Sequence, residues 1–375
     1  MAKRSEKAVP LTGVGAMHRN NFDALRLCMA LLVIWSHSFA LYFGTEAREP
    51  VSMLLAGHYN AGNVGVRVFF IVSGFLICHS WLRSPDIADY LGRRIMRIYP
   101  GFLVAAAICA FVVVPLFSVQ GWAALTPGEV LKSLGSHLLL RDRMPTADTF
   151  PDNPIAAVNG ALWSIPFEFW CYLATPVIGL LGLLRRRGLL LALAVAIMAV
   201  RVWLDLTGRQ PGGGVIGLVI GWPYAWFNLA PCFLAGMLVR LYHDRLTRSP
   251  ALLVAGVVAM VAAANLLPGI WSKIVCDLLF PPVVAYATFM FAFSSRLRLH
   301  GVARRGDFSY GTYLYGFPIQ QMVMALAGGW MPFAVYVPVV MALSLAAGVL
   351  SWNAVEKHFL PRSRQQKVPA AAAEA

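Results

Sequence analysis

Apolar stretches about as long as a membrane-crossing helix recur along the whole sequence. An α-helix rises about 1.5 Å per residue, so about 20 apolar residues cross the roughly 30 Å of hydrocarbon in a bilayer. Hydrophobic residues make up 59% of the chain and charged residues 13%, whereas soluble domains average about 45–50% and about 25%. The sequence therefore predicts an all-α polytopic membrane protein with about ten transmembrane helices. We expect these spans at residues 22–43, 62–82, 98–119, 161–184, 188–206, 223–241, 251–268, 274–294, 308–327 and 332–352.

The distribution of positive charge predicts the orientation of these spans. If the N-terminus is cytoplasmic, most of the 31 lysine and arginine residues fall in cytoplasmic segments. The opposite side then holds only Arg48, Lys132, Arg141, Arg143, Arg209 and Lys273. This bias is typical of multi-pass membrane proteins, and it predicts an even number of spans with the N- and C-termini in the cytoplasm. It also accounts for the net charge of +14 without a nucleic-acid partner.

The predicted domain organisation is simple. A cytoplasmic N-terminal segment (1–21) precedes one membrane domain (22–352), and a cytoplasmic tail (353–375) follows it. The first apolar span is too long for a cleaved signal peptide, so we expect it to be retained. The glycine-rich stretch at 211–221 is apolar but too short to cross a bilayer, and we interpret it as a re-entrant or interfacial segment.

The first span places ionisable residues in an otherwise apolar helix. A charged side chain at that depth costs at least about 2.5–3.5 kcal/mol, so such residues usually have a function. Arg26 and His37 are separated by three helical turns plus about 20°, so they share one face and lie about 16 Å apart along the axis. Histidine exchanges protons near neutral pH, which makes His37 a candidate general base. The alternative is a structural hydrogen bond to a neighbouring helix.

The second span adds a polar pair and a notch of small residues. Asn63 and Arg67 are four residues apart, so they share a helical face near the outer end. We predict that both contact a substrate. Ser73 and Gly74 follow, with Ser73 as a candidate for binding the donor. Close helix packing is the alternative interpretation of this notch, because small residues let helices approach one another.

A cluster of arginines precedes the third span. Arg94 and Arg97 are three residues apart and therefore neighbours on a helix, with Arg93 beside them. Guanidinium groups keep their charge and offer several hydrogen-bond donors, which suits them to bind phosphate. Taken alone, ordinary anchoring at the cytoplasmic membrane surface explains the cluster better.

The fourth span carries an embedded carboxylate, Glu168. Tyr172, four residues later on the same face, is a candidate substrate contact. Pro166 is compatible with a helix only if that helix begins near Ser164, which would then be its N-cap. Trp163 fits the outer aromatic belt of a membrane protein and is a candidate substrate contact. Glu168 is a candidate for orienting either the imidazole of His37 or an acceptor hydroxyl. A structural hydrogen bond is the alternative.

The ninth span is unusually polar, and its tyrosines Tyr310 and Tyr313 are candidates for lining a substrate cavity or for an interfacial belt. No metal site is predicted, because the six cysteines lie in apolar segments and none forms a CxxC pair.

Taken together, these segments resemble the acyltransferase-3 family, the integral-membrane O-acyltransferases of surface polysaccharides and related glycans. The resemblance runs from about residue 20 to about residue 360, and the order of its motifs makes it specific. It is carried by Arg26 and His37, by VFFIVSGFLI (68–77), RRIMRIYP (93–100), LWSIPFEFW (162–170) and FSYGTYLYGFPI (308–319), and by Glu356.

The resemblance implies a ten-span fold in the cell inner membrane. It also implies acetyl-CoA, or a related acyl-CoA, as a donor substrate from the cytoplasm, and a carbohydrate such as O-antigen, exopolysaccharide or another glycan as acceptor. No permanently bound cofactor and no metal are implied. By the same resemblance the catalytic residues are His37 and Glu168, and the donor-binding residues are Arg26, Arg94 and Arg97, with Arg93 beside them. Pro166, Phe167 and Gly316 depart from the usual pattern, which bears on the acceptor side more than on the donor side.

A proton-coupled transporter is the alternative function. Embedded His, Arg and Glu residues and a broken span would suit the export of a glycan or small molecule. A transporter of this kind predicts internal repeats between the two halves of the chain, and we find none.

Overall fold

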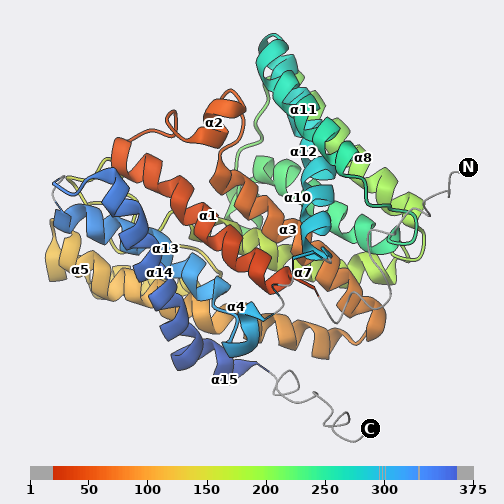
Figure 1. The fold of residues 1–375 in the computed structure, drawn as a ribbon. Coiled ribbons are helices and arrows are strands. Elements are labelled where there is room, and N and C mark those ends of the chain that lie inside the picture. Colours follow the sequence, from red (N-terminus) through yellow and green to blue (C-terminus); the bar gives the residue numbers. More distant parts are fainter. Residues whose placement is uncertain (1–19, 295, 298, 300, 328–329, 361–375) are drawn as a thin grey trace, which may run out of the picture.

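The computed structural model describes residues 20–294, 296, 297, 299, 301–327 and 330–360, and it contains no β-strand within these ranges. The described part of the chain is mostly helical (Figure 1). Their bounds are α1 (Phe22–Phe43), α2 (Pro50–Leu54), α3 (Ala61–Arg83), α4 (Ile87–Ile108), α5 (Val114–Phe117), α6 (Pro127–Leu138), α7 (Ile165–Leu180), α8 (Arg187–Leu206), α9 (Gly214–Ile220), α10 (Pro223–Leu241), α11 (Pro250–Leu266), α12 (Gly269–Ala292), α13 (Ser309–Ala327), α14 (Phe333–Ser351) and α15 (Lys357–Phe359).

Each of the ten predicted spans coincides with one of these helices, and the all-α membrane fold is confirmed. By length and composition, seven helices of the described chain can cross a bilayer. Among the helices that match predicted spans, α7 and α11 are the short ones, with 16 and 17 residues, and α13 is more polar. The number of ten crossings therefore stays a prediction, as does the placement of both termini in the cytoplasm.

Two helices are longer than the sequence predicted. Helix α4 begins at Ile87 rather than near residue 98, because Asp86 caps its first turn by accepting a hydrogen bond from the Asp89 amide. The arginine cluster is therefore helical. At the other end of the chain, a π-helical turn (Trp352–Glu356) continues α14 into α15, so the helical run ends at Phe359 rather than at residue 352.

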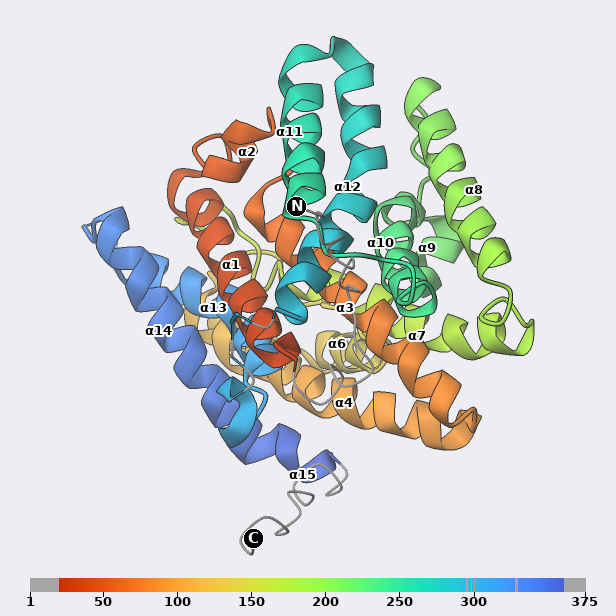
Figure 2. The ribbon, with the colours of Figure 1, turned by 45° about the vertical axis from the view of Figure 1, so that its right-hand side comes forward.

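The helices form a central group with two flanks. In the centre, α3 packs against both α1 and α10, and α12 lies beside them (Figure 1). On one flank α13 packs between α1 and α14. On the other, α11 and α12 form a hairpin that projects beside α8, while α4 runs beneath the group (Figure 2). Residues far apart in the sequence therefore meet around α1 and α3.

The predicted re-entrant segment contains α9, a helix of seven residues that is too short to cross a bilayer. Its end is held by indole groups of two neighbouring helices. Trp170 Nε1 donates to the Val219 carbonyl at 3.0 Å, and Trp226 Nε1 donates to the Ile220 carbonyl at 2.9 Å. The segment is thus part of the helix bundle rather than an extended loop.

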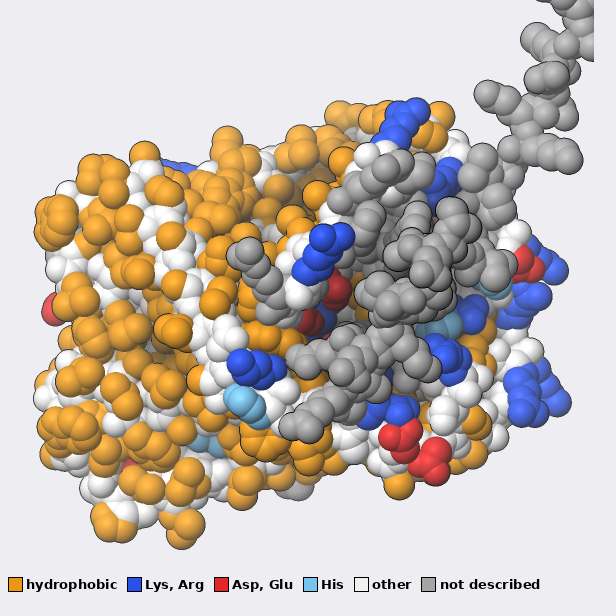
Figure 3. Space-filling view, turned by 60° about the horizontal axis from the view of Figure 1, so that its bottom comes forward, with side chains coloured by type: hydrophobic (Ala, Val, Ile, Leu, Met, Phe, Trp, Pro, Cys, Tyr) orange, Lys and Arg blue, Asp and Glu red, His pale blue; other side chains and the backbone are white. Residues whose placement is uncertain are grey.

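Figure 3 shows one face of the molecule on which lysine and arginine side chains gather toward one side, while hydrophobic side chains dominate the other. This separation is expected of a protein in a bilayer, because charged side chains favour the aqueous boundary and apolar side chains favour the hydrocarbon.

The close contact between α3 and α10 depends on two glycines. A Cβ atom at Gly74 would lie 2.0 Å from the Phe233 carbonyl oxygen, and one at Gly236 would lie 2.0 Å from the Ile71 carbonyl oxygen. No side-chain carbon fits at either position unless the two backbones separate. Close packing, which the sequence left as one interpretation of the notch, is therefore the role of Gly74.

Gly74→Ala is expected to destabilise the protein by about 1–3 kcal/mol, because the added methyl group overpacks the α3–α10 contact. Thermal unfolding in detergent measures the effect. Gly92→Ala is the matched control, since a Cβ atom at Gly92 meets nothing within 4 Å. That change is expected to stabilise α4 by about 0.5–1 kcal/mol. Equal melting temperatures for Gly74→Ala and wild type would contradict the packing role.

Candidate active site

His37 lies on α1 with its ring half-buried and edge-on to the ring of Phe317, at a centroid distance of 5.3 Å. No hydrogen bond joins its ring nitrogens to any other group of the described chain. The next turn is fixed to α13, because Gln320 Nε2 donates to the Ile34 carbonyl at 2.8 Å and to Ser38 Oγ at 2.9 Å. The imidazole is therefore held in position by packing while its nitrogens are left for a ligand.

Glu168 lies on α7, and its carboxylate is engaged by two hydroxyl groups. Ser73 Oγ on α3 donates to Glu168 Oε1 at 2.6 Å, and the Tyr172 hydroxyl donates to the same oxygen at 2.5 Å. Within the described chain no hydrogen bond joins Glu168 to His37. The suggestion that Glu168 orients the imidazole directly thus has no counterpart in this geometry. Instead, Glu168 links α3 to α7.

The start of α7 agrees with the sequence-based expectation. Its N-cap is Ser164, so Pro166 falls in the first turn, where its missing N–H needs no partner. The Ser164 side chain does not cap the helix, however. Its Oγ lies 2.8 Å from the Tyr313 hydroxyl, which in turn donates to the Ala161 carbonyl at 2.6 Å. Tyr313 therefore fastens α13 to the beginning of α7.

Arg94 extends this polar group toward the arginine cluster. Its guanidinium lies 5.8 Å from the ring centroid of Tyr172 and 5.6 Å from that of Tyr90, and Nη2 donates to Ser80 Oγ at 3.2 Å. Its Nε is buried without a partner among the described residues, and no carboxylate there forms an ion pair with it. Arg94 thus retains donors for an anion. Arg93, by contrast, pairs with Asp89 on the exposed side of α4.

Arg26 and Arg97 converge on one carboxylate, that of Asp307. Arg26 Nη1 lies 2.5 Å and Arg97 Nη2 2.6 Å from the same oxygen, Oδ2. The other oxygen accepts from Ser309 Oγ at 2.5 Å. Glu356 stands 4.0 Å from Arg97 as a second acid. Burial opposes ionisation of Asp307, but the two guanidinium groups outweigh it and hold the pKa of this carboxyl below its usual range.

Asp307 is a residue of this site to which the sequence analysis gave no role. The sequence does indicate that such an acid is needed, because Arg26 and Arg97 are embedded or nearly so and an embedded cation requires an anionic partner. Asp23 was the nearer acid on the same face of α1, but it is exposed and forms no ion pair in the described chain. The partner comes instead from the loop before α13.

Tyr310 also lies in this region, beneath the Arg97 guanidinium at 5.7 Å from the ring centroid. Its hydroxyl donates to the Ile98 carbonyl at 2.9 Å. The hydroxyls of Tyr310, Tyr313 and Tyr172 are thus already engaged within the helix bundle. These three residues do not line the cavity that the other predicted substrate contacts share.

Asn63, Arg67 and Trp163 do meet, at a cavity of about 540 Å³ that we term the outer cavity. This volume lies within the range of about 300–1,000 Å³ typical of small-molecule sites. Arg67 Nη1 donates to Asn63 Oδ1 at 2.7 Å, as expected for residues four apart on a helix. The cavity is also lined by Leu140, Arg141, Asp142, Leu162, Pro166, Phe167, Gly221, Trp222, Ala225 and Asn228.

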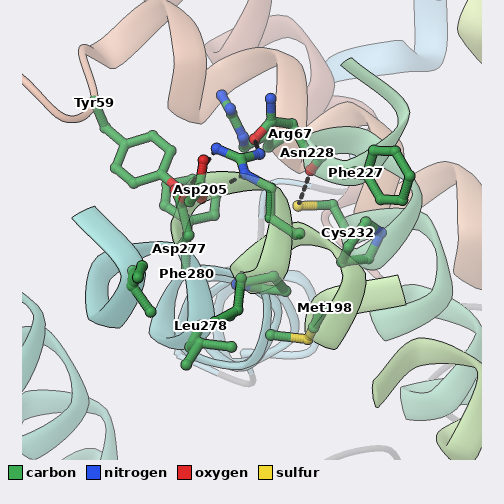
Figure 4. Close-up of a pocket in the computed structure, with 15 residues that line it drawn as sticks. Tyr59, Arg67, Met198, Asp205, Phe227, Asn228, Cys232, Asp277, Leu278 and Phe280 are labelled. Carbon is green, nitrogen blue, oxygen red and sulfur yellow. Dashed lines mark hydrogen bonds and ion pairs between the residues drawn. The ribbon is translucent and has the colours of Figure 1, made fainter. Parts of the chain in front are cut away.

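Beside the outer cavity lies a cluster of four charges on α8 and α12. Three of its members line a small cavity of about 20 Å³, where Figure 4 labels Asp205 and Asp277. Arg201 pairs with Asp205 at 2.8 Å, and the two residues are four apart on α8. Asp277, which had no evident role in the sequence, accepts from Arg201 at 2.7 Å and from Lys273 at 3.0 Å. Lys273 also lies 2.8 Å from Asp205. We term these four residues the charge cluster.

Within the described chain, no group of three or more His, Cys, Asp or Glu side chains is arranged to hold a metal ion.

Comparison with known proteins identifies the family of this chain. A family profile described as an acyltransferase domain matches residues 19–353. The chain belongs to the acyltransferase-3 family. The match covers nearly the whole membrane domain, including the His37, Glu168 and Asp307 regions.

Curated relatives point the same way. The chain is 32% identical to an O-acetyl transferase of Shigella phage Sf6, over 92% of this chain and 98% of that protein. It is 26% identical to Nodulation protein 10 of Rhizobium leguminosarum bv. viciae, over 91% and 93% of the two chains. A shorter match, 29% identical over 42% of this chain and 38% of the relative, is to acyltransferase MdmB of Streptomyces mycarofaciens. No solved structure matches significantly. The protein is thus a multi-pass membrane acyltransferase.

Proposed function

We propose that this acyltransferase moves an acyl group, acetyl in the simplest case, from cytoplasmic acyl-CoA to a hydroxyl of a carbohydrate, such as O-antigen, exopolysaccharide or another glycan, across the cell inner membrane. The observation that carries the proposal is His37, a half-buried imidazole whose nitrogens have no hydrogen-bond partner in the described chain. A general base must reach the proton that it removes, and its nitrogens are available to do so.

In this proposal the acceptor hydroxyl donates its proton to His37 while its oxygen attacks the thioester carbonyl carbon. An ester C–O bond forms, the C–S bond breaks, and the coenzyme leaves as a thiolate that takes up the proton from the imidazolium. A two-step route through an acyl group on the imidazole gives the same products. Glu168, Ser73 and Tyr172 form a polar junction of α3 and α7, so Glu168 acts by orienting the acceptor or by holding these helices.

The donor is expected at the arginine-rich end of the bundle. Arg94 supports this part of the proposal most directly, because its Nε is buried without a partner and no carboxylate neutralises it in the described chain. Arg26 and Arg97 share Asp307, so any phosphate that they bind competes with this carboxylate. The axial distance of about 16 Å between Arg26 and His37 is one that a pantetheine arm can span.

Arg94→Ala is expected to raise KM for acyl-CoA about 10- to 100-fold, because a hydrogen bond to a charged group contributes about 1.5–3 kcal/mol. Initial rates of CoA release against acetyl-CoA concentration measure it. Arg93→Ala is the control, since Arg93 is paired with Asp89 on the exposed side of α4 and should change KM little. Equal values of KM for the two variants would contradict a phosphate-binding role of Arg94.

The proposed function is tested with inverted membrane vesicles that contain the protein, and with matched vesicles that lack it. Both receive radiolabelled acetyl-CoA or succinyl-CoA together with a lipid-linked or polymeric glycan fraction. Release of CoA and transfer of label to the glycan only in the presence of the protein would support the proposal and identify the acyl group. CoA release without label in the glycan would point to a different acceptor class. Neither event, with the protein folded and inserted, would refute acyl-CoA as donor.

A further inference from the structure

The outer cavity is lined by an arginine, Arg67, with which no carboxylate of the described chain pairs. Arg67 lies on the membrane helix α3. Its Nη1 donates to Asn63 Oδ1 at 2.7 Å and more weakly to the Asn63 carbonyl at 3.3 Å. A guanidinium within a membrane helix is expected to have an anionic partner, so the missing partner requires an explanation.

Asp277 lines the same small cavity as Arg67, and both of its oxygens already accept hydrogen bonds from other residues. One oxygen accepts from the Tyr59 hydroxyl, and the other accepts from Arg201 at 2.7 Å and from Lys273 at 3.0 Å. The charge cluster has two positive and two negative members and is neutral as a unit. The charge cluster therefore supplies no excess negative charge to Arg67, whose side chain lies near Asp277 and Asp205 in Figure 4.

The position of Arg67 is nevertheless well defined. Its guanidinium lies 4.8 Å from the ring centroid of Tyr59 and 5.3 Å from that of Phe280, which are themselves stacked at 4.3 Å. Because the Tyr59 hydroxyl is bonded to Asp277, the charge cluster fixes the aromatic surface against which Arg67 rests. Asn63 holds the other side of the guanidinium. Arg67 is thus pre-organised next to the cavity, and no carboxylate of the described residues pairs with it.

The rest of the lining suits a sugar. Trp163 and Trp222 line the outer cavity and are 44% and 49% exposed overall, so both indoles are available for a pyranose ring to stack on. Asn63 and Asn228 add amide groups for hydroxyls. Among the charged lining residues, Arg67 and Arg141 stand against one exposed carboxylate, Asp142, which leaves a net positive charge.

We propose that the outer cavity binds the acceptor and that Arg67 selects an acceptor with an anionic group, a carboxylate or a phosphate, on or next to the sugar that receives the acyl group. This inference rests on the proposed function and deepens it by naming the class of acceptor. Arg67 binds the anion and takes no part in proton transfer, so it determines specificity and affinity. The planar guanidinium can form two parallel hydrogen bonds to either oxyanion, which an ammonium group cannot.

The test is equilibrium binding to the full chain in lipid nanodiscs, because sugar-headed detergents would compete for the cavity. The three probes are methyl glucuronoside, glucose 1-phosphate and the neutral methyl glucoside. Binding of each probe is measured by the change in tryptophan fluorescence. We expect wild type to prefer at least one anionic probe to the glucoside by about 10-fold or more, with weaker binding at high salt. Preference for the glucuronoside would identify an acidic sugar as the source of the anion, and preference for the phosphate a phosphorylated or lipid-phosphate-linked one.

Three variants make the assignment specific. Arg67→Gln is expected to lose about 10- to 100-fold in affinity for the anionic probe and to leave glucoside binding unchanged. Arg67→Lys, which keeps the charge, should recover part of the affinity. Arg209→Gln is the matched control, because Arg209 rests on Trp203 at the surface, 5.3 Å from its ring centroid, and does not line the cavity.

Equal affinity of wild type for all three probes, or equal affinity of wild type and Arg67→Gln for the anionic probes, would overturn the inference. So would the absence of any binding. Because binding is measured without acyl-CoA, these results test acceptor binding alone and do not decide whether the protein transfers an acyl group. Acyl transfer to a neutral glycan in vesicles, with an unchanged rate in Arg67→Gln, would leave the acyltransferase proposal intact while removing this one.

Discussion

Replacement of His37 by alanine is expected to lower the rate of acyl transfer about 100- to 10,000-fold. A positioned general base contributes about this factor. Within the described chain, α1 carries no other imidazole that could replace His37 as the base. Transfer of label from radiolabelled acetyl-CoA to the glycan fraction in inverted vesicles measures the effect. Binding of acyl-CoA should change little, because Arg94 lies on a different helix.

His37→Gln and His358→Ala are the controls for this prediction. The glutamine fills part of the space against Phe317 but cannot act as a base near neutral pH, so it should be as inactive as alanine. His358 is exposed on α15 and should be dispensable. An unchanged rate of acyl transfer in His37→Ala would exclude His37 both as the general base and as the acyl carrier. Rapid release of one equivalent of CoA in the absence of acceptor, lost in His37→Ala, would favour the acyl carrier.

Much of the fold followed from the sequence because a bilayer imposes a single requirement on each helix. A length of about 20 apolar residues is read directly from the chain, and all ten predicted spans lie on helices. The ends of the helices were less predictable. Helix α4 begins at Ile87, since an Asp86 N-cap and an exposed, charged first turn can extend a membrane helix into water.

The residues of the candidate site could be predicted from the sequence, but the contacts between them could not. Embedded ionisable residues are conspicuous in an apolar chain, which is why Arg26, His37 and Glu168 stood out. Which groups they contact depends on how α13 and α7 pack against α1 and α3, and spacing within one helix does not contain that information. Glu168 therefore meets Ser73 rather than His37. In the same way, Arg26 meets Asp307 from a distant loop rather than Asp23 from its own helix.

The small residues illustrate the same limit. Gly316, a departure from the family pattern, packs against α1, where an added Cβ atom would lie 2.6 Å from Ile34 Cγ1. A larger side chain at this position would displace α13 from α1, one turn away from His37. The structure thus gives Gly316 a packing role in this chain, for which the sequence alone offered no reason.

Asp307→Asn is expected to destabilise the protein by about 3–5 kcal/mol, because it leaves two mostly buried guanidinium groups without their shared anion. Thermal unfolding in detergent measures the loss. Asp89→Asn is the matched control, since it breaks a pair with Arg93 in which the Asp89 side chain is 53% exposed, and exposed pairs contribute less than about 1 kcal/mol. Equal shifts in the two variants would contradict a structural role of Asp307.

The dependence on pH separates the loss of the Asp307 charge from a general packing defect. The pKa of Asp307 is lowered in the folded protein, so its stabilising contribution is present above the unfolded value of about 3.9 and is lost as the pH falls below it. Wild type should therefore lose stability more steeply than Asp307→Asn between about pH 5 and pH 3.

A double variant tests the same ion pair. Removing one of the unpaired guanidinium charges should offset part of the stability loss, so Arg26→Gln combined with Asp307→Asn should be less destabilising than the sum of the two single changes. Parallel pH profiles and additive effects would mean that the carboxylate is not the anion that holds Arg26 and Arg97 together.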